Sequence, residues 1–283
     1  MTRYEYDVPL SGECFMEARL RPLTVPGEQT CRAYAITTDP PAAIFSYDQP
    51  NEMGFVSHFI LRGEPYSVLT IRADSVAETL VGNPFEHLDL LAEDWTKLAE
   101  KHFCDQWAEF LAPTPLVPLH GTWPGPEPPA SVLAYGQAVS EAIYTQFEYV
   151  PGATDILTPL SEFVSQKRGV CQDYAHLMLS AARSRGVPAR YVSGYIYAGA
   201  EEGTQGAGAT HAWVELFLPS TRTWQGFDPT NNVLVAGSHI KVAVGRDYAD
   251  VPPTKGLLRA ALGSPLPTET ALVVEVTVEK MEE

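Results

Sequence analysis

The sequence predicts an α+β protein: an antiparallel β-sandwich over residues 1–80, followed by a domain that combines helices with antiparallel strands. Three observations predict this class. The first 80 residues alternate between apolar and polar side chains and are interrupted by Gly- and Pro-rich turns. Helical segments with one apolar face follow from Ser131 onward. Segments typical of strands come after those helices, and this order favours an α+β domain.

The composition is that of a folded protein, and it disfavours two classes of partner. The 283 residues are 45% hydrophobic, which supplies enough apolar side chains for two modest domains. The 35 Asp and Glu outnumber the 19 Lys and Arg, so the formal net charge is −16. This balance disfavours nucleic acid and anionic membranes as partners. No apolar run is long enough for a membrane helix, and "MTRYEYDVPL" does not resemble a secretion signal, so we expect a cytoplasmic protein.

The four cysteines are scattered along the chain, at Cys14, Cys31, Cys104 and Cys171, with no Cys-x-x-Cys pair and no zinc-ligand spacing. We therefore expect neither a metal nor a cofactor. A disulfide between Cys14 and Cys31 stays open from the sequence. The oligomeric state and any regulation by calcium also stay open, although no EF-hand-like loop is present.

The N-terminal part contains five segments rich in Val, Ile, Thr and aromatic residues, which we expect to be the strands of a small sandwich. These segments are 3–10, 14–23, 31–38, 54–62 and 66–76. A connector over residues 81–130 follows. Its residues 86–111 have the spacing of a helix, and the Pro-dense residues 112–130 have the composition of a linker.

We assign residues 131–283 to the second domain and its C-terminal extension. Three helices are expected first, at 131–147, 158–169 and 171–186. Strands are expected at 189–198, 210–218 and 223–228, before the segment 239–253 and a last strand at 271–279.

The third predicted helix begins with a cysteine, in "KRGVCQDYAH". Cys171 would share a face of small residues with Ala175, Met178 and Ala182, so it should point inward. Unpaired N–H groups in the first helical turn favour a thiolate and can bind an oxyanion, whereas the nearby charge of Asp173 opposes the thiolate. A cysteine that only fills space is therefore the alternative to a nucleophile, and a partner base must decide between them.

A histidine and an aspartate on the next hairpin are candidates for that base and its orienting group. Alternation along residues 211–218 places His211 off the apolar face. If the hairpin turns between residues 219 and 220, His211 lies directly opposite Asp228, with Cβ atoms about 4.5–5.5 Å apart. If it turns one residue later, the two are diagonal neighbours about 7–8 Å apart between Cα atoms. Either register lets an imidazole reach a carboxylate.

These motifs resemble the bacterial transglutaminase-like superfamily, a papain-related group of thiol enzymes. The resemblance is carried by "GVCQDYAH", "HAWVE" and "FDPTN", which place the family's Cys, His and Asp at Cys171, His211 and Asp228. The N-terminal β region and "HIKVAVGRDYADVPPTKG" resemble the parts that flank the core in this branch. The resemblance implies a papain/transglutaminase-like core, and a thiol enzyme that forms a thioester and passes the acyl group to an amine or to water.

We interpret the chain as an acyl-transfer enzyme with a Cys-His-Asp triad that acts on a peptide or protein substrate. Hydrolysis of peptide or amide bonds is the leading hypothesis, because water at about 55 M outcompetes an amine unless the site binds the amine or excludes water. Two alternatives remain, namely a true transglutaminase and a non-catalytic binding scaffold that retains the triad.

Several further residues are weaker candidates for the cleft or its surroundings. They are Gln172, Tyr174, Trp213, Arg246 and Asp247. Trp213 could shield the triad, shape the substrate cleft or simply pack. Gln172 points off the face of Cys171, and Tyr174 is expected to pack or to support the site from behind. Arg246 and Asp247 either border the cleft or belong to a turn tied by an Arg to Asp pair.

Two other interpretations concern neighbouring residues. A metal site built from Cys171, His176, His211 and Asp228 is disfavoured, because His176 lies well round the helix from Cys171. The glycine-rich segment 199–210 precedes His211 and is either a substrate-gating loop or an inert exposed one.

Overall fold

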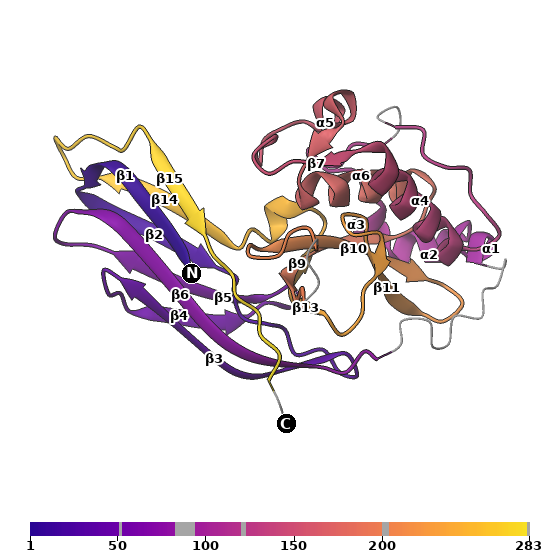
Figure 1. Cartoon of the computed structure of the whole chain (residues 1–283), viewed down its shortest axis with the longest axis horizontal. Helices are drawn as coiled ribbons and strands as arrows, with labels where there is room; N and C mark the ends of the chain where they lie inside the picture. The colour runs from indigo at the N-terminus through magenta and orange to yellow at the C-terminus, as the bar shows by residue number, and fades with distance from the viewer. Residues whose placement is uncertain (51–52, 83–93, 120–122, 200–203, 282–283) are drawn as a thin grey trace.

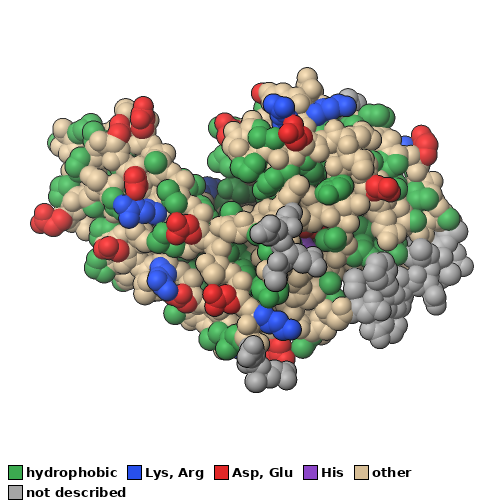
Figure 2. All heavy atoms as spheres, viewed as in Figure 1, with side chains coloured by type: hydrophobic (Ala, Val, Ile, Leu, Met, Phe, Trp, Pro, Cys, Tyr) green, Lys and Arg blue, Asp and Glu red, His purple; other side chains and the backbone are tan. Residues whose placement is uncertain are grey.

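The computed structural model describes residues 1–50, 53–82, 94–119, 123–199 and 204–281. Its elements form two lobes, one made of strands and one in which helices cover a sheet (Figure 1). Figure 2 shows a notch between the lobes that is lined largely by hydrophobic side chains. On this face, Lys and Arg lie among Asp and Glu.

The first lobe is the expected β-sandwich. Its N-terminal strands are β1 (Thr2–Leu10), β2 (Gly12–Ala18), β3 (Gln29–Asp39), β4 (Ile44–Asp48), β5 (Phe55–Leu61) and β6 (Tyr66–Thr79). They form two sheets, with orders β15-β1-β6-β3 and β14-β2-β5-β4. Alternate residues of β2, such as Cys14 and Met16, point into the core between the sheets. The predicted sandwich is confirmed, although β4, a short strand between two Pro-containing turns, was not expected.

The C-terminal strands differ from the expected domain boundaries. β14 (Thr254–Ala260) pairs antiparallel with β2, and β15 (Thr270–Val274) pairs antiparallel with β1. The chain therefore returns to the sandwich, whereas we assigned residues 131–283 to the second domain and its extension. Strand pairing over more than 230 residues, such as Ala18 with Thr254, leaves no local signal in the sequence.

The connector contains short helices within residues 86–111, where the spacing of a helix was expected. They are α1 (Asp94–Leu98), α2 (Lys101–Gln106) and α3 (Ala108–Leu111). The beginning of the predicted helix, over residues 86–93, lies outside the described residues. The extended backbone of Glu100, with ψ 129°, ends the first of these helices. The later two helices lay Phe103 and Trp107 against Phe217 of the second lobe.

The second lobe has the expected α+β organisation. Its elements are α4 (Val132–Gln146), β7 (Glu148–Tyr149), α5 (Leu160–Gln166), β8 (Arg168–Gly169), α6 (Cys171–Ser184), β9 (Ala189–Ile196), β10 (His211–Leu218), β11 (Thr223–Asp228), β12 (Val233–Leu234), β13 (His239–Gly245) and the 3₁₀ turn η2 (Tyr248–Asp250). The antiparallel sheet has the order β12-β11-β10-β9-β13, and α6 packs on β9 and β10. None of the described helices is long and apolar enough to cross a membrane.

Both faces of β10 are buried, for different reasons. Its even-numbered residues, including Val214, pack against the helices as the alternation predicts. On the opposite face, Trp213 packs against Leu23 and Val25, which belong to the segment leaving the sandwich. The buried amide of Gln29 strengthens this junction, because it donates to the carbonyls of Leu23 and Lys241 and accepts the Lys241 N–H. The sandwich thus supports the back of the sheet.

Helix α4 approaches β11 so closely that only glycine fits at position 136. An added Cβ would lie 2.4 Å from Phe227 Cζ and 3.0 Å from Leu216 Cδ1. Alanine in a helix is ordinarily more stable than glycine by roughly 0.5–1 kcal/mol. We expect Gly136→Ala instead to lower the free energy of unfolding by about 1–3 kcal/mol, because the core is overpacked. Urea unfolding would measure it.

The matched control is Gln137→Ala, at the next, exposed position of the same helix. Its effect should stay within about 0.5 kcal/mol. Equal stability of the Gly136→Ala variant and the unmodified protein would contradict the close approach of α4 to β11.

Candidate active site

Cys171 is the first residue of α6 and is partly buried. Ala175, Met178 and Ala182 are buried on the same face, which confirms the predicted small-residue stripe. The turn before the helix is fixed by the left-handed backbone of Lys167, with φ 55°. The backbone N–H of Glu148 donates to the Lys167 carbonyl at 2.8 Å. These contacts hold the thiol where the first N–H groups of the helix are unpaired.

Asp173 caps the same helix. Its Oδ2 accepts the Val170 N–H at 2.8 Å and the Thr154 hydroxyl at 2.5 Å. Burial raises the pKa of this carboxyl, against the effect of the two hydrogen bonds. The carboxylate therefore turns back toward the start of the helix, and its predicted opposition to the thiolate is weakened by these donors. Gly169 permits the arrangement, since a Cβ there would lie 2.6 Å from the Asp173 oxygen.

His211 and Asp228 meet in the second of the two expected registers. Val214 pairs with Phe227, so the hairpin turns between residues 220 and 221 and Asp228 is diagonal to His211. Arg222 closes the turn with a left-handed φ of 59° and donates its N–H to the Leu218 carbonyl. His211 Nε2 lies 2.8 Å from Asp228 Oδ2. Nδ1 is thereby left as the imidazole nitrogen available to Cys171.

The imidazole and the carboxylate form a buried charged pair, since neither side chain is exposed. Burial lowers the pKa of His211, but the charge and hydrogen bond of Asp228 and the hydrogen bond and charge of Cys171 together raise it to about 10. Burial likewise raises the pKa of Asp228, but the charges and hydrogen bonds of His211 and His239 hold it well below its ordinary value. The site therefore favours an imidazolium beside a carboxylate.

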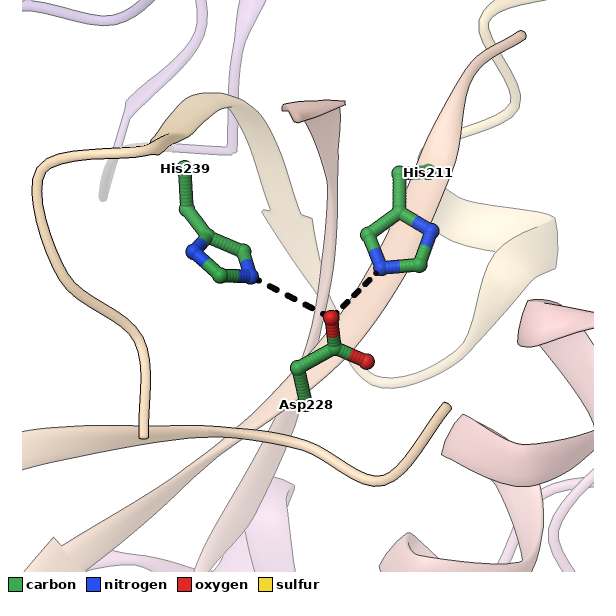
Figure 3. A group of neighbouring side chains, drawn as sticks. All are labelled: His211, Asp228 and His239. Carbon is green, nitrogen blue, oxygen red and sulfur yellow. Dashed lines mark hydrogen bonds and ion pairs between the residues drawn. The ribbon is translucent and has the colours of Figure 1, made fainter. Parts of the chain in front are cut away.

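The structure adds two partners of Asp228 that the sequence did not predict. His239 Nε2 lies 3.2 Å from Asp228 Oδ2, on the opposite side from His211 (Figure 3). Asn231 Nδ2 donates to the same oxygen at 2.7 Å. The backbone N–H groups of Thr230 and Asn231 donate to Oδ1, at 3.0 and 3.3 Å. The motif "DPTN" could have indicated Asn231, because Asx side chains bond backbone groups two or three residues away. The sequence could not indicate His239, because its position depends on the pairing of β13 with β9.

Tyr149 is a third residue near the site that the sequence did not indicate. Burial, followed by the charges of Cys171 and Asp228, raises the pKa of its phenol to about 12. Tyr149 is partly exposed on β7. It therefore brings a neutral hydroxyl close to both charged groups.

The described end of the glycine-rich segment lies directly on His211. A Cβ at Gly206 would be 2.3 Å from His211 Nδ1. Asn231 holds this segment, accepting the Gln205 N–H at 2.8 Å and donating to the Gln205 carbonyl at 3.1 Å. Asn231 thus connects residues 204–208 with Asp228. Gln205 and Gly206 are docked on the site, whereas residues 200–203 lie outside the described residues, so the choice between a gating loop and an inert one stays open.

The weaker candidates take mainly structural positions. Tyr174 is buried among aromatic rings that include Phe147 and Phe163. Trp213 is fully buried, and its ring centroid lies 6.2 Å from that of His211, so it packs behind the histidine. Gln172 is partly exposed in the first turn of α6. Its role stays a prediction.

Arg246 and Asp247 lie at the end of β13 opposite to His239, about 20 Å away along the strand. Arg246 pairs with Asp250 through Nε at 2.8 Å and a terminal nitrogen at 2.9 Å. Asp247 caps η2 by accepting the Ala249 N–H. The turn tied by an Arg to Asp pair, one of the two expectations, is the one observed. A place at the border of the cleft stays a prediction for these two residues.

The possible metal ligands do not form one cluster. His176 lies outside the site, where its Nε2 accepts the Tyr248 N–H and burial lowers its pKa to about 3. The ligand atoms of His211, Asp228 and His239 lie within 4.8 Å of one another. However, both imidazole Nε2 atoms already hydrogen-bond the carboxylate, so a metal would have to displace both protons. All four cysteines are free thiols, so the possible Cys14 to Cys31 disulfide is not formed.

The fold and the site define a papain-like α+β core with an appended β-sandwich and a Cys-His-Asp group at one end of the sheet. Residues 125–229 match the transglutaminase-like superfamily, and residues 1–78 match the bacterial transglutaminase-like N-terminal region. The chain belongs to the transglutaminase-like superfamily.

Similar proteins cover most or all of the chain. An uncharacterized protein of Mycobacterium leprae is 34% identical over 98% of this chain and 96% of its own length. One of Mycobacterium tuberculosis is 32% identical over 81% of this chain and 77% of its own. A crystal structure from Cytophaga hutchinsonii, of a protein proposed to be a cysteine protease, covers 99% of this chain and 91% of its own with a TM-score of 0.62. At 18% identity, it shows a shared fold.

Substitution of Gly206 should undock the glycine-rich segment from His211. The imidazole is buried and held by Asp228, so the segment must yield when a Cβ arrives 2.3 Å from Nδ1. We expect Gly206→Ala to speed hydrogen exchange of the Gln205 amide at least about tenfold, because its bond to Asn231 is lost.

Gly208→Ala is the matched control. Gly208 has nearly the same backbone, with φ 86° against 84° for Gly206, but a Cβ there would meet nothing within 4 Å. Both variants therefore introduce similar backbone strain. Equal exchange rates in the two variants would contradict the contact with His211.

Proposed function

We propose that this protein is a thiol-dependent acyl-transfer enzyme that hydrolyses peptide or amide bonds through a thioester at Cys171. The observation that supports it is the position of the His211 imidazole, whose Nε2 bonds a buried carboxylate while the Cys171 thiol acts on its pKa. A nucleophile, a base and a group that orients the base are what thiol catalysis requires.

In the first half of the reaction, His211 Nδ1 takes the proton of Cys171, and the thiolate attacks the carbonyl carbon of an amide. The resulting oxyanion is stabilised by unpaired N–H groups at the start of α6. The intermediate then collapses, the C–N bond breaks, and the imidazolium gives its proton to the departing amine. A thioester at Cys171 and a free amine remain.

In the second half, His211 takes a proton from water, and the resulting hydroxide attacks the thioester carbonyl. Collapse of this second intermediate breaks the C–S bond and releases a carboxylic acid. The thiolate is restored beside the imidazolium. Asp228 supports both halves without changing its own protonation, because it holds Nε2 and stabilises the positive ring.

The substrate that we propose is a peptide or protein, and water is the proposed acceptor. Water at about 55 M outcompetes an amine as the acyl acceptor unless a site concentrates the amine or excludes water. The formal net charge of −16 favours the approach of neutral or cationic substrates over acidic ones.

Thiol labelling is the direct test of the nucleophile. Cys31 and Cys104 are partly exposed, as Cys171 is, and serve as internal references for labelling that depends on exposure alone. We expect iodoacetamide at neutral pH to label Cys171 at least about tenfold faster, because an imidazolium stabilises its thiolate. Mass spectrometry of peptides after timed labelling would measure each rate.

Two variants control this measurement. Cys171→Ser should abolish the fast labelling, and His211→Ala should slow it to the rate of Cys31. Similar labelling rates at all accessible cysteines, unchanged by His211→Ala, would contradict the proposed triad.

Hydrolysis and amine transfer can be separated with a library of glutamine-containing peptides, incubated with and without a primary amine. Hydrolysis converts an amide to an acid whether or not the amine is present, because water is the acceptor. We therefore expect mass spectrometry to show acid products in both samples, and their loss in Cys171→Ser. Products that contain the amine would make the protein a transglutaminase instead.

A further inference from the structure

His239 contacts the carboxylate of the site but lies outside residues 125–229, which match the superfamily core. It is the first residue of β13, and this strand pairs with β9 so that His239 lies opposite Ile196. Its side chain is 1% exposed, against 0% for Asp228. A buried imidazole that approaches a catalytic carboxylate from the side opposite to the base requires a functional explanation.

The hydrogen bonds of His239 determine its tautomer. Nε2 faces Asp228 Oδ2 at 3.2 Å, and a carboxylate oxygen can only accept, so Nε2 carries the hydrogen. Nδ1 lies 3.2 Å from the Ser238 hydroxyl, which can donate to it. The ring also packs edge-on against Trp213, at 5.2 Å between centroids. Both ring nitrogens of His239 thus have a hydrogen-bond partner.

Asp228 Oδ2 is shared between the two histidines (Figure 3). We propose that His239 is a positioning residue for this site: its Nε2–H holds Asp228 toward His211 and takes up part of the negative charge on Oδ2, so that His211 can release its proton. This inference rests on the proposed function, and it extends the Cys-His-Asp group to four residues.

The effect on His211 follows from the number of donors on one oxygen. A carboxylate whose charge is shared with another N–H stabilises a neighbouring imidazolium less than a carboxylate without that donor. In the thioester, the charge of the Cys171 thiolate is gone, and His211 must be neutral to take a proton from water. Without the His239 donor, His211 would hold its proton more tightly and turnover would slow.

The other titratable groups around this cluster do not replace His239. Cys171 of α6 and Tyr149 of β7 interact electrostatically with the charged pair, Cys171 with His211 and Tyr149 with Asp228. Tyr144 and Tyr197 line a hollow together with His239 and bring phenol groups to it. Lys241 lies on the same face of β13 but is committed elsewhere, since its ammonium pairs with Glu215 at 2.6 Å and Glu28 at 2.8 Å.

The test compares His239→Phe, which keeps a ring but removes the donor, with His239→Gln, whose amide nitrogen can donate from a similar place. The probe is p-nitrophenyl acetate, because its burst reports formation of the thioester and its steady rate reports hydrolysis. For His239→Phe we expect a retained burst, a steady rate about tenfold lower at pH 7, and a pH profile of the steady rate shifted upward by about one unit. His239→Gln should restore both.

The titration of the His211 imidazole, followed by NMR, is a readout that does not depend on turnover. We expect it to move to higher pH in His239→Phe and to return in His239→Gln. If the unmodified protein neither bursts nor turns over the ester, the proposed function fails, and the titration alone decides the role of His239.

A role of His239 in packing alone would give a different pattern. The Phe and Gln variants would then behave alike, with the pH profile and the His211 titration unmoved, and this result would overturn the proposal. If His239→Phe does not fold, Ser238→Ala decides in its place, because it removes the partner of Nδ1 and leaves the ring. An upward shift in Ser238→Ala, smaller than one unit, supports the proposal, and an unmoved titration overturns it.

Discussion

The site depends on one buried charge, the carboxylate of Asp228. An ionised carboxylate without water is stable only when its oxygens are satisfied by donors, because desolvation costs several kcal/mol. Here two imidazoles and the Asn231 amide serve one oxygen, and two backbone N–H groups serve the other. These donors come from β10, β13 and the turn after β11, so the same interactions that satisfy the charge also fix the relative positions of the strands.

The back of the sheet is organised by the same requirement. Glu215, two residues along β10 from Trp213, is buried, and burial raises its pKa. Lys241 at 2.6 Å and Arg190 at 2.6 Å overcome this effect and keep it ionised. Lys241 in turn reaches Glu28 of the sandwich. The polar face of β10 therefore needs partners from several parts of the chain, and the sandwich is one of them. We infer that the two lobes hold His211 in place together.

What the sequence could predict follows from the range of each interaction. The stripe below Cys171 and the approach of His211 to Asp228 depend on residues at most 17 positions apart, within one helix or one hairpin, and both are found. The return of β14 and β15 to the sandwich spans most of the chain and was missed. His239 was missed for the same reason, since its place depends on β13 pairing with β9 rather than with β11.

The net charge of the site explains the role of the hydrogen-bond donors at the start of α6 and around Asp228. The thiolate, the imidazolium and the carboxylate together carry one net negative charge. In the proposed reaction, the thiolate attacks a carbonyl and that charge moves from sulfur to oxygen, while the imidazolium and Asp228 keep theirs. Cys171 is the first residue of α6, so in this reaction the charge would stay near the start of the helix, and the donors on Asp228 would not need to rearrange. Donors already in place lower the barrier most, because no reorganisation energy is spent during the reaction.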